Sequence, residues 1–183
     1  MSSHKRITKA YKTARRISYN DDSKFIIFSD VHRGDNSFAD DFASNRNIYF
    51  HALNHYYKKG FTYCELGDGD ELWENLDFKS IFYTHTNIYF LLKKFYNKGR
   101  LFRLIGNHDM VYRKQKYVEK HLYTYFDKVT GKNEPLFPGI IFTEGLVLEH
   151  EKSKQEIFML HGHQADWWNY RAWKFNRFMV RAL

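Results

Sequence analysis

The stretch Phe61–Trp73, FTYCELGDGDELW, organises the predicted fold. Residues Phe61–Leu66 favour β-structure and predict a short strand. This strand runs into the sequence GDGD at 67–70, a turn through which neither a strand nor a helix continues. A carboxylate at the end of a buried strand, with a glycine on each side, can reach a metal ion from the rim of a sheet. We therefore expect Asp68 to bridge two metal ions.

Three further apolar runs are each followed at once by a polar loop. The runs are Phe25–Phe28, Leu101–Ile105 and Ile157–Leu160, and their loops are Ser29–Asp35, Gly106–Asp109 and His161–His163. Open α/β sheets bind ligands outside the carboxyl ends of their strands. The four strand-and-loop units are therefore expected to bring their polar side chains together around Asp68.

Composition indicates a folded, basic protein. The 183 residues are enough for one domain with a substantial core, and an aromatic content of 19% argues against disorder. The formal net charge is +8, and residues 1–20 contain six Lys or Arg but no acid. A basic protein with an acidic site that binds cations suits a phosphorylated or otherwise anionic substrate. We expect residues 1–23 to form a basic N-terminal arm and residues 24–183 to form the catalytic domain.

The sequence has the features neither of a disulfide-rich protein nor of a membrane or secreted protein. Cys64 is the only cysteine, so the chain has no disulfide framework. No apolar run approaches the length of a membrane span, and the N-terminus lacks the apolar core of a signal peptide. A cytoplasmic location without a transmembrane segment is therefore expected.

Hydrophobic periodicity predicts an α/β fold. Helices are expected over Asn45–Lys59, Phe78–Tyr96 and Tyr117–Phe126, a loop over Thr130–Pro138, and strands over Ile140–Phe142, Leu146–Glu149 and Glu156–Leu160. Strands alternate with helices in the first half and follow one another in the second. This order predicts two sheets packed face to face, with helices outside.

The loop after the first strand contains the pattern Asp30-x-His32, which places two types of metal ligand on one turn. The same pattern also arises from a capping aspartate beside a surface histidine, which is the commoner case. Arg33 follows directly and could hold a phosphate oxygen, although a lone arginine is more often solvated.

The loop after the third strand is more specific, because asparagine is an unusual metal ligand. Asn107 can offer its amide oxygen to a cation, which leaves His108 to face the substrate. Asp109 is placed to orient the ring of His108. In the last loop we expect His161 to be a metal ligand and His163 to lie behind it.

Both ends of the chain interleave basic with apolar residues. Residues 1–20 show helical spacing at Ile7, Ala10, Tyr11, Ala14 and Ile17. Residues 166–183 combine Arg171, Lys174, Arg177 and Arg181 with Trp167, Trp168, Trp173, Phe175, Phe178 and Met179. Such segments can contact an anionic membrane or nucleic acid. A solvated N-terminal arm and a C-terminal helix that covers a core are the favoured interpretations.

Taken together, the motifs at Asp30-x-His32, Gly67-Asp68, residues 106–109 and His161 resemble the calcineurin-like metallophosphoesterase superfamily. The resemblance covers roughly residues 24–166. Within the superfamily, the loop at 67–73 and the aromatic-basic stretch after His161 are similar to the UDP-2,3-diacylglucosamine hydrolase-like branch.

The resemblance implies a four-layer αββα sandwich with a dinuclear metal site. If the matching residues have the roles that the family gives them, Asp30 and His32 bind one metal, Asn107 and His161 bind the other, and Asp68 bridges them. His108 would be the acid that protonates or stabilises the leaving oxygen.

The chain departs from the family pattern in its last loop. The family has a Gly-His-x-His sequence there, whereas Gly162-His163 is followed by Gln164 and Ala165. We therefore expect this chain to be a C-terminally truncated form of a longer protein.

The implied function is metal-dependent hydrolysis of a phosphoester or a pyrophosphate by a metal-bound hydroxide. Ligation by nitrogen and oxygen without thiolate favours Mn²⁺, with Fe or Zn²⁺ as alternatives. A non-catalytic module that keeps the fold and acts in binding remains open. The sequence does not distinguish monoester, diester, nucleotide-sugar pyrophosphate and phosphoprotein substrates.

Overall fold

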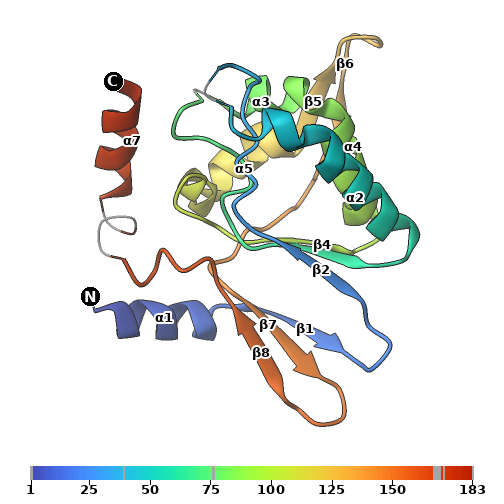
Figure 1. Cartoon of the computed structure of the whole chain (residues 1–183), viewed down its shortest axis with the longest axis vertical. Helices are drawn as coiled ribbons and strands as arrows, with labels where there is room; N and C mark the ends of the chain where they lie inside the picture. The colour runs from blue at the N-terminus through green and yellow to red at the C-terminus, as the bar shows by residue number, and fades with distance from the viewer. Residues whose placement is uncertain (1, 39, 76, 167–169, 171, 183) are drawn as a thin grey trace.

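Two three-stranded sheets carry the fold, and the predicted α/β class with more than one sheet is confirmed (Figure 1). The computed structural model describes residues 2–38, 40–75, 77–166, 170 and 172–182. The strands are β1 (Arg15–Tyr19), β2 (Phe25–Phe28), β3 (Thr62–Glu65), β4 (Leu101–Arg103), β5 (Thr124–Asp127), β6 (Lys132–Pro135), β7 (Leu146–His150) and β8 (Glu156–Met159). The α-helices are α1 (Ser3–Lys12), α2 (Arg46–Lys58), α3 (Phe78–Thr84), α4 (Thr86–Asn97), α5 (Gln115–Leu122) and α7 (Trp173–Ala182). Two 3-10 turns, η1 (Ala43–Asn45) and η2 (Met110–Arg113), lie between them.

The first sheet has the order β2-β3-β4, and all its strands are parallel. Cys64 at its centre is opposite Ile27 on one side and Phe102 on the other. Parallel pairing brings the carboxyl ends of the three strands to one edge of the sheet, which is the edge where the sequence places its polar loops. This sheet therefore sets the position of the candidate site.

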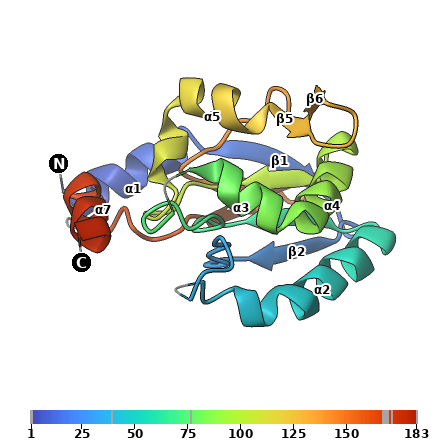
Figure 2. The same cartoon turned by 90° about the horizontal axis from the view of Figure 1, so that it is seen from above.

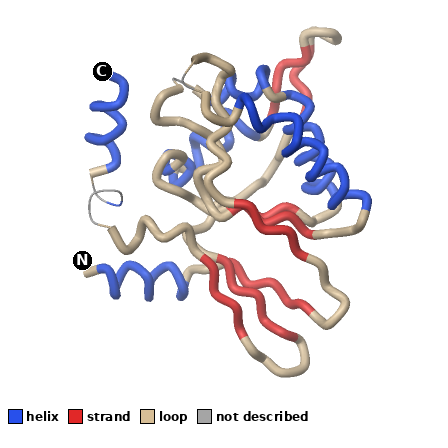
Figure 3. The backbone as a smooth tube through the Cα atoms, in the orientation of Figure 1, coloured by secondary structure: helices blue, strands red, loops and turns tan. Residues whose placement is uncertain are grey.

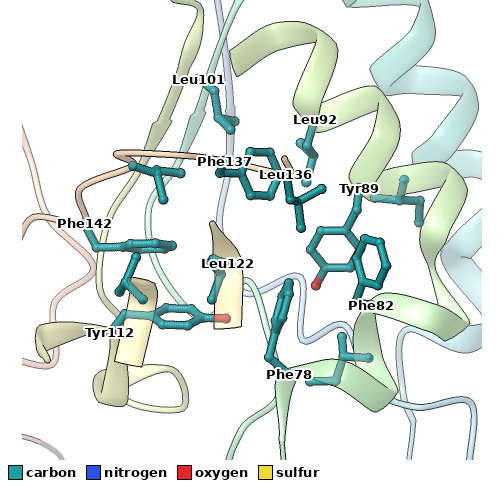
Figure 4. Packing of buried hydrophobic residues seen from close by; sticks show 14 of the residues in the cluster. Phe78, Phe82, Tyr89, Leu92, Leu101, Tyr112, Leu122, Leu136, Phe137 and Phe142 are labelled. Atoms are coloured by element: carbon teal, nitrogen blue, oxygen red, sulfur yellow. The ribbon is translucent and has the colours of Figure 1, made fainter. Parts of the chain in front are cut away.

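Helices pack on one face of the first sheet and enclose an aromatic core (Figures 2 and 4). Tyr63 of β3 and Leu101 of β4 face this core, and Tyr89 and Phe95 of α4 lie against them. Rings meet mainly edge to face or tilted, as Phe78 and Tyr89 do with centroids 5.1 Å apart. The high aromatic content of the sequence is accounted for largely by this core.

The second sheet has the order β1-β7-β8 and packs against the other face of the first sheet. The contact is a small cluster in which Cys64 and Leu104 meet Leu146 and Leu148 of β7. The tube in Figure 3 shows the two sheets side by side, with the hairpin of β5 and β6 separate from both. Cys64 is fully buried, which raises the pKa of its thiol to about 12, and it packs as a small apolar residue.

Residues 2–23 are integrated into the fold, which corrects the expectation of a separate basic arm. The helix ends at Lys12, and Arg15–Tyr19 forms β1, which pairs in parallel with β7 from Arg15↔Leu146 to Tyr19↔His150. A strand whose partner lies so far along the chain leaves no local signal, so the helical spacing up to Ile17 was misleading. Arg6 of α1 is buried and its Nε donates to the Gln164 carbonyl at 2.5 Å.

Several helices and strands differ in extent from the sequence predictions. The region 78–96 is two helices that meet at His85 rather than one. The predicted loop at 130–138 contains β6, and 140–142 is not a strand. The C-terminal helix is present as α7, with Phe175 and Phe178 more than half exposed, while residues 167, 168 and 171 lie outside the described part.

Within the described residues, no helix has both the length and the apolar character needed to cross a bilayer.

Candidate metal centre

The loop after β2 lies directly alongside the loop after β3. The amide of Asp30 donates to the Gly67 carbonyl at 3.2 Å, and the amide of His32 donates to the Asp68 carbonyl at 2.9 Å. These bonds extend the parallel pairing past the ends of both strands. Asp30 and His32 are thereby held beside Asp68, as the sequence predicted.

The loop after β4 approaches Asp68 from the other side. The amide of His108 donates to Asp68 Oδ1 at 2.8 Å. Gly106 makes this approach possible, because a Cβ atom at that position would lie 1.9 Å from Asp68 Oδ1. The glycine before Asn107 is therefore a steric requirement of the site.

Three residues of this centre adopt a left-handed backbone. Asp30, His32 and Asp68 have φ angles of 55°, 51° and 51°. Each such non-glycine conformation costs on the order of 1–3 kcal/mol and persists only where the surrounding structure enforces it. Strain concentrated on three predicted ligands favours a functional role for this geometry.

Asp68 is the common member of two groups of metal-ligand type. One group is His32, Asp68 and His108, and the other is Asp30, Asp68 and His161; within each group the ligand atoms lie within 4.8 Å of one another. Asp68 Oδ2 lies 3.2 Å from His161 Nε2 and 3.7 Å from His32 Nε2. A buried carboxylate oxygen between two histidines is the arrangement expected of a bridging ligand.

The grouping differs in one respect from the sequence expectation. Asp30 falls with His161, although its Oδ1 also lies 4.0 Å from His32 Nε2. His108, expected to face the substrate, lies within ligand distance of Asp68. Asn107 is placed as expected, with its Oδ1 3.1 Å from His161 Nε2.

The protonation of His161 follows from its partners. Its Nδ1 lies 3.0 Å from the Leu66 carbonyl, which can only accept, so Nδ1 carries the proton. In the neutral ring, Nε2 then has a lone pair directed at the oxygens of Asn107 and Asp68. Acceptor atoms that face one another at about 3 Å require a cation or a proton between them.

His32 and His108 are held in the same way by Glu71. The Nδ1 atoms of both rings lie 2.7 Å from Glu71 Oε2. Although burial favours the neutral acid, the hydrogen bonds from His108 and His32 lower the pKa of Glu71 to about 2. An ionised Glu71 only accepts, so both histidines keep Nε2 for the site. Metal-binding histidines usually donate their other ring N–H to a carboxylate or a carbonyl.

The charges of the site are consistent with cation binding. Burial opposes the protonation of His161 and His32, yet nearby carboxylates raise the pKa of both: Asp68 for His161, and Glu71 and Asp68 for His32. Burial also works against the ionisation of Asp68, but its bond to His161 lowers its pKa. Imidazole nitrogen and carboxylate or amide oxygen without thiolate suit Mn²⁺, Fe or Zn²⁺, so these residues fit the expected metals.

Asp109 does not orient His108, which corrects the sequence expectation. Its carboxylate accepts from the amides of Gly106 and Gly69 at 2.7 and 3.0 Å. Burial and the nearby Asp68 raise the pKa of Asp109 to about 7. Asp109 thus joins the loop after β4 to the loop after β3, and the orienting role belongs to Glu71.

Trp73 supports the same ring from its other side. Its indole stacks on His108 with centroids 4.0 Å apart and an interplanar angle of 16°. Its Nε1 donates to the Asn107 carbonyl at 2.7 Å. Glu71 and Trp73 were not predicted as site residues, although both lie in the stretch that anchors the fold.

Arg33 lies below the site and cannot contact a substrate, which corrects its predicted role. Its side chain is fully buried, and it forms ion pairs with Glu65 at 2.7 Å and Asp70 at 2.8 Å. Arg103 pairs with the same two acids at 2.5 and 2.8 Å. We call Arg33, Glu65, Asp70 and Arg103 the buried ion-pair cluster.

Tyrosine hydroxyls complete the hydrogen bonding of this cluster. Tyr89 and Tyr112 both donate to Asp70 at 2.5 Å, and Tyr63 donates to Glu65 at 2.7 Å. The two arginines outweigh the burial of Asp70 and hold its pKa well below the usual range. The buried ion-pair cluster joins β3 (Glu65) and β4 (Arg103) to the loop after β2 (Arg33) and the loop after β3 (Asp70).

His163 turns away from the centre. It lies 3.3 Å from Glu144 Oε2, and its ring stacks on Tyr170. Arg113 also pairs with Glu144, and the hydrogen bonds from His163 and Arg113 overcome burial to lower the pKa of Glu144 to about 2. The last loop therefore brings one histidine, His161, to the centre.

Comparisons with known proteins gave no match to a family model, a curated protein or a solved structure. The geometry of the two ligand groups therefore carries the functional conclusion.

Proposed function

We propose that this chain is a metal-dependent hydrolase of phosphoesters or phosphoanhydrides, of the calcineurin-like metallophosphoesterase type. The observation that carries the proposal is the position of Asp68, which belongs to both ligand groups and lies at the meeting point of four strand-end loops. Each histidine that faces Asp68 has its other nitrogen held by an acceptor. Such preorganisation matches what a dinuclear centre requires.

The ligand roles follow from the atoms that face Asp68. His32 and His108 lie on one side, and Asp30 and His161, with Asn107 beside His161, lie on the other. When bound, two divalent cations would supply charge stabilisation for the phosphoryl oxygens and activate water for attack. Hydrolysis breaks the phosphorus–oxygen bond to the leaving alcohol, and water supplies the new oxygen on phosphorus and the proton on the alcohol.

His108 is suited to deliver that proton. Glu71 fixes its Nδ1 and Trp73 packs against its face, so the ring has one orientation. The Nε2 atom is the remaining position from which a proton can pass to the leaving oxygen. The ligand-like distance of His108 from Asp68 makes metal binding the competing role, and the experiment below separates the two.

The same proposal assigns a four-layer αββα sandwich to the fold. Helices on one face of the first sheet, and a second sheet on its other face, support three of these layers. The outer layer on the second sheet is the part of the assignment for which the described residues give no support.

A non-catalytic binding module is the second candidate, and the orientation of His163 favours it. One histidine rather than two reaches the centre from the last loop, which removes a nitrogen donor. Metal content distinguishes the candidates: near-zero occupancy at saturating Mn²⁺ favours the module, and about two ions per chain favours the hydrolase.

The decisive test is Mn²⁺-dependent hydrolysis of bis-p-nitrophenyl phosphate and p-nitrophenyl phosphate by the full chain. Asp68→Ala should abolish both activity and metal binding. His108→Ala should abolish activity and keep the metal content, whereas loss of an ion would make His108 a ligand. Glu119→Gln, an exposed change on α5, is the control. Full activity in Asp68→Ala would refute the proposal.

A further inference from the structure

A cavity of about 380 Å³ lies beside His32 and His108. It is the space that a substrate would occupy next to the candidate metal centre. Beyond the metal-ligand residues its wall includes Phe42, Asp41 and Glu74. The chemistry of this wall therefore bears on which organic group a phosphoester substrate would carry.

The wall is negatively charged. None of the described residues that line the cavity is Lys or Arg, whereas Asp41 and Glu74 both contribute carboxylates. Neither acid forms an ion pair with any described residue, and both are exposed. Burial, and then the neighbouring carboxylates of Glu71 and Asp41, raise the pKa of Glu74, as expected in a negative field.

Bound cations would not cancel this charge. The four positive charges of two divalent cations would be met by Asp30, Asp68, the ionised Glu71 and a diester phosphate. Arg33, the basic residue of the adjacent loop, is already neutralised within the buried ion-pair cluster. Asp41 and Glu74 thus remain as two carboxylates of the cavity wall that have no cationic partner among the described residues.

We propose that the cavity binds the organic group of a phosphoester and that this group is positively charged, as in the phosphate esters of amino alcohols. The proposal rests on the proposed hydrolase function and specifies its substrate class. Two carboxylates stabilise an ammonium group and repel a second phosphate, which disfavours nucleotide-sugar pyrophosphates and polyphosphorylated peptides. Phe42 also lines the cavity and adds apolar contact for the carbon atoms of such an ester.

The test uses two substrates that differ in one atom. p-Nitrophenyl phosphorylcholine carries a quaternary nitrogen, and 3,3-dimethylbutyl p-nitrophenyl phosphate has carbon in its place. Both release p-nitrophenol, so one assay measures kcat/KM for each with the Mn²⁺-loaded full chain. We expect about a tenfold preference for the choline ester, since two partly exposed ion pairs contribute modestly. The preference should decrease as salt is raised.

Variants assign the preference to the cavity. The double variant Asp41→Asn, Glu74→Gln should bring the ratio of the two kcat/KM values close to one. Glu119→Gln, which removes an exposed carboxylate elsewhere, should leave the ratio unchanged. A preference that survives the double variant would overturn the assignment to these two residues.

The remaining outcomes separate this proposal from the hydrolase function. Equal rates for the two esters, or a faster carbon analogue, would overturn the cationic substrate class while the hydrolase function stands. A failure to hydrolyse the diesters and p-nitrophenyl phosphate alike would overturn the hydrolase function, and the cationic substrate class would fall with it.

Discussion

Glu71→Gln is the substitution that most directly tests how the metal-ligand histidines are fixed. The carboxylate of Glu71 accepts from Nδ1 of His32 and Nδ1 of His108, both at 2.7 Å, and from the Trp73 amide at 3.0 Å. Glutamine keeps the shape of the side chain but has one oxygen, and it presents N–H groups in place of the other. If the glutamine oxygen takes the Oε2 position, an N–H group faces the Trp73 amide; in the other orientation an N–H group faces both histidines. In either case the histidines have at best a neutral acceptor in place of a charged one.

The size of the effect follows from these contacts. A hydrogen bond to a charged group contributes about 1.5–3 kcal/mol, and outer-shell partners of metal ligands typically change metal affinity or activity by about 10–100-fold. We therefore expect Mn²⁺ affinity to fall about 10–100-fold in Glu71→Gln. Hydrolysis should fall at least as much, because the same change disturbs His108.

The stability of the metal-free chain should also depend on Glu71 at low pH. Its pKa is lowered from 4.5 to about 2, so the stabilisation is complete above the unfolded pKa and is lost as the pH falls from about 4 to about 2. A shift of this size corresponds to roughly 3 kcal/mol. Glu71→Gln should flatten the acid limb of the pH–stability curve.

Glu144→Gln is the matched control. Glu144 is also buried in part, its pKa is also about 2, and it also accepts from a histidine, His163. This histidine lies away from the centre, so the control should lose stability without losing Mn²⁺ affinity. Titration calorimetry with Mn²⁺ and urea unfolding measure the two quantities. Equal Mn²⁺ affinity in Glu71→Gln and in the wild type would refute the orienting role.

Three further predictions concern the surroundings of the centre. Arg103→Met leaves Glu65 and Asp70 with one arginine between them. The substitution should lower the free energy of unfolding by about 3–5 kcal/mol in urea titrations. A loss below about 1 kcal/mol would contradict the structural role of the buried ion-pair cluster. His85 is fully buried and burial lowers its pKa, so its contribution to stability is present above about pH 6.5 and is lost as the pH falls. The melting temperature of His85→Gln should therefore fall less between pH 7 and pH 5 than that of the wild type, and parallel curves would exclude this contribution. Gly106→Ala forces a Cβ against Asp68, so Mn²⁺ binding should be lost even where circular dichroism shows a folded chain; retained binding would show that the loop can move away.

The convergence of the four loops was predictable because its signals are local. Each strand is a short apolar run, and each is ended by a glycine or a polar turn within a few residues. Parallel pairing then places the ends of β2, β3 and β4 together without further information. Asp30, His32, Asp68 and Asn107 could be expected to lie together for this reason, whereas His161 follows β8 of the second sheet.

The partners of those residues could not be predicted, because they depend on strand register and side-chain direction. Arg33 follows His32 in sequence, yet it points into the core, where the Arg33↔Asp70 bridge places it next to an acid. Asp109 follows His108 directly, but the acceptor that reaches the ring is Glu71, from another loop. Adjacency in sequence was a poor guide in both cases.

The pairing of β1 could not be predicted either, because it depends on a partner that is distant in the sequence. Arg15–Tyr19 finds its partner in β7, and Ile17 packs between the two sheets only once that pairing exists. Before the pairing is known, two arginines and an isoleucine fit a basic helix equally well. Long-range parallel pairing is the kind of contact that local periodicity does not encode.

The stretch that anchors the fold also explains why the centre should attract cations. The side chain of Asp70 belongs to the buried ion-pair cluster, whose two arginines and two acids carry no net charge. That cluster therefore fixes the loop without supplying positive charge to the site above it. Asp68 and Glu71 instead contact the site histidines, and with Asp30 they place three carboxylates at the centre. Divalent cations would relieve this imbalance, and the effect would be greatest at Asp68, which both ligand groups share.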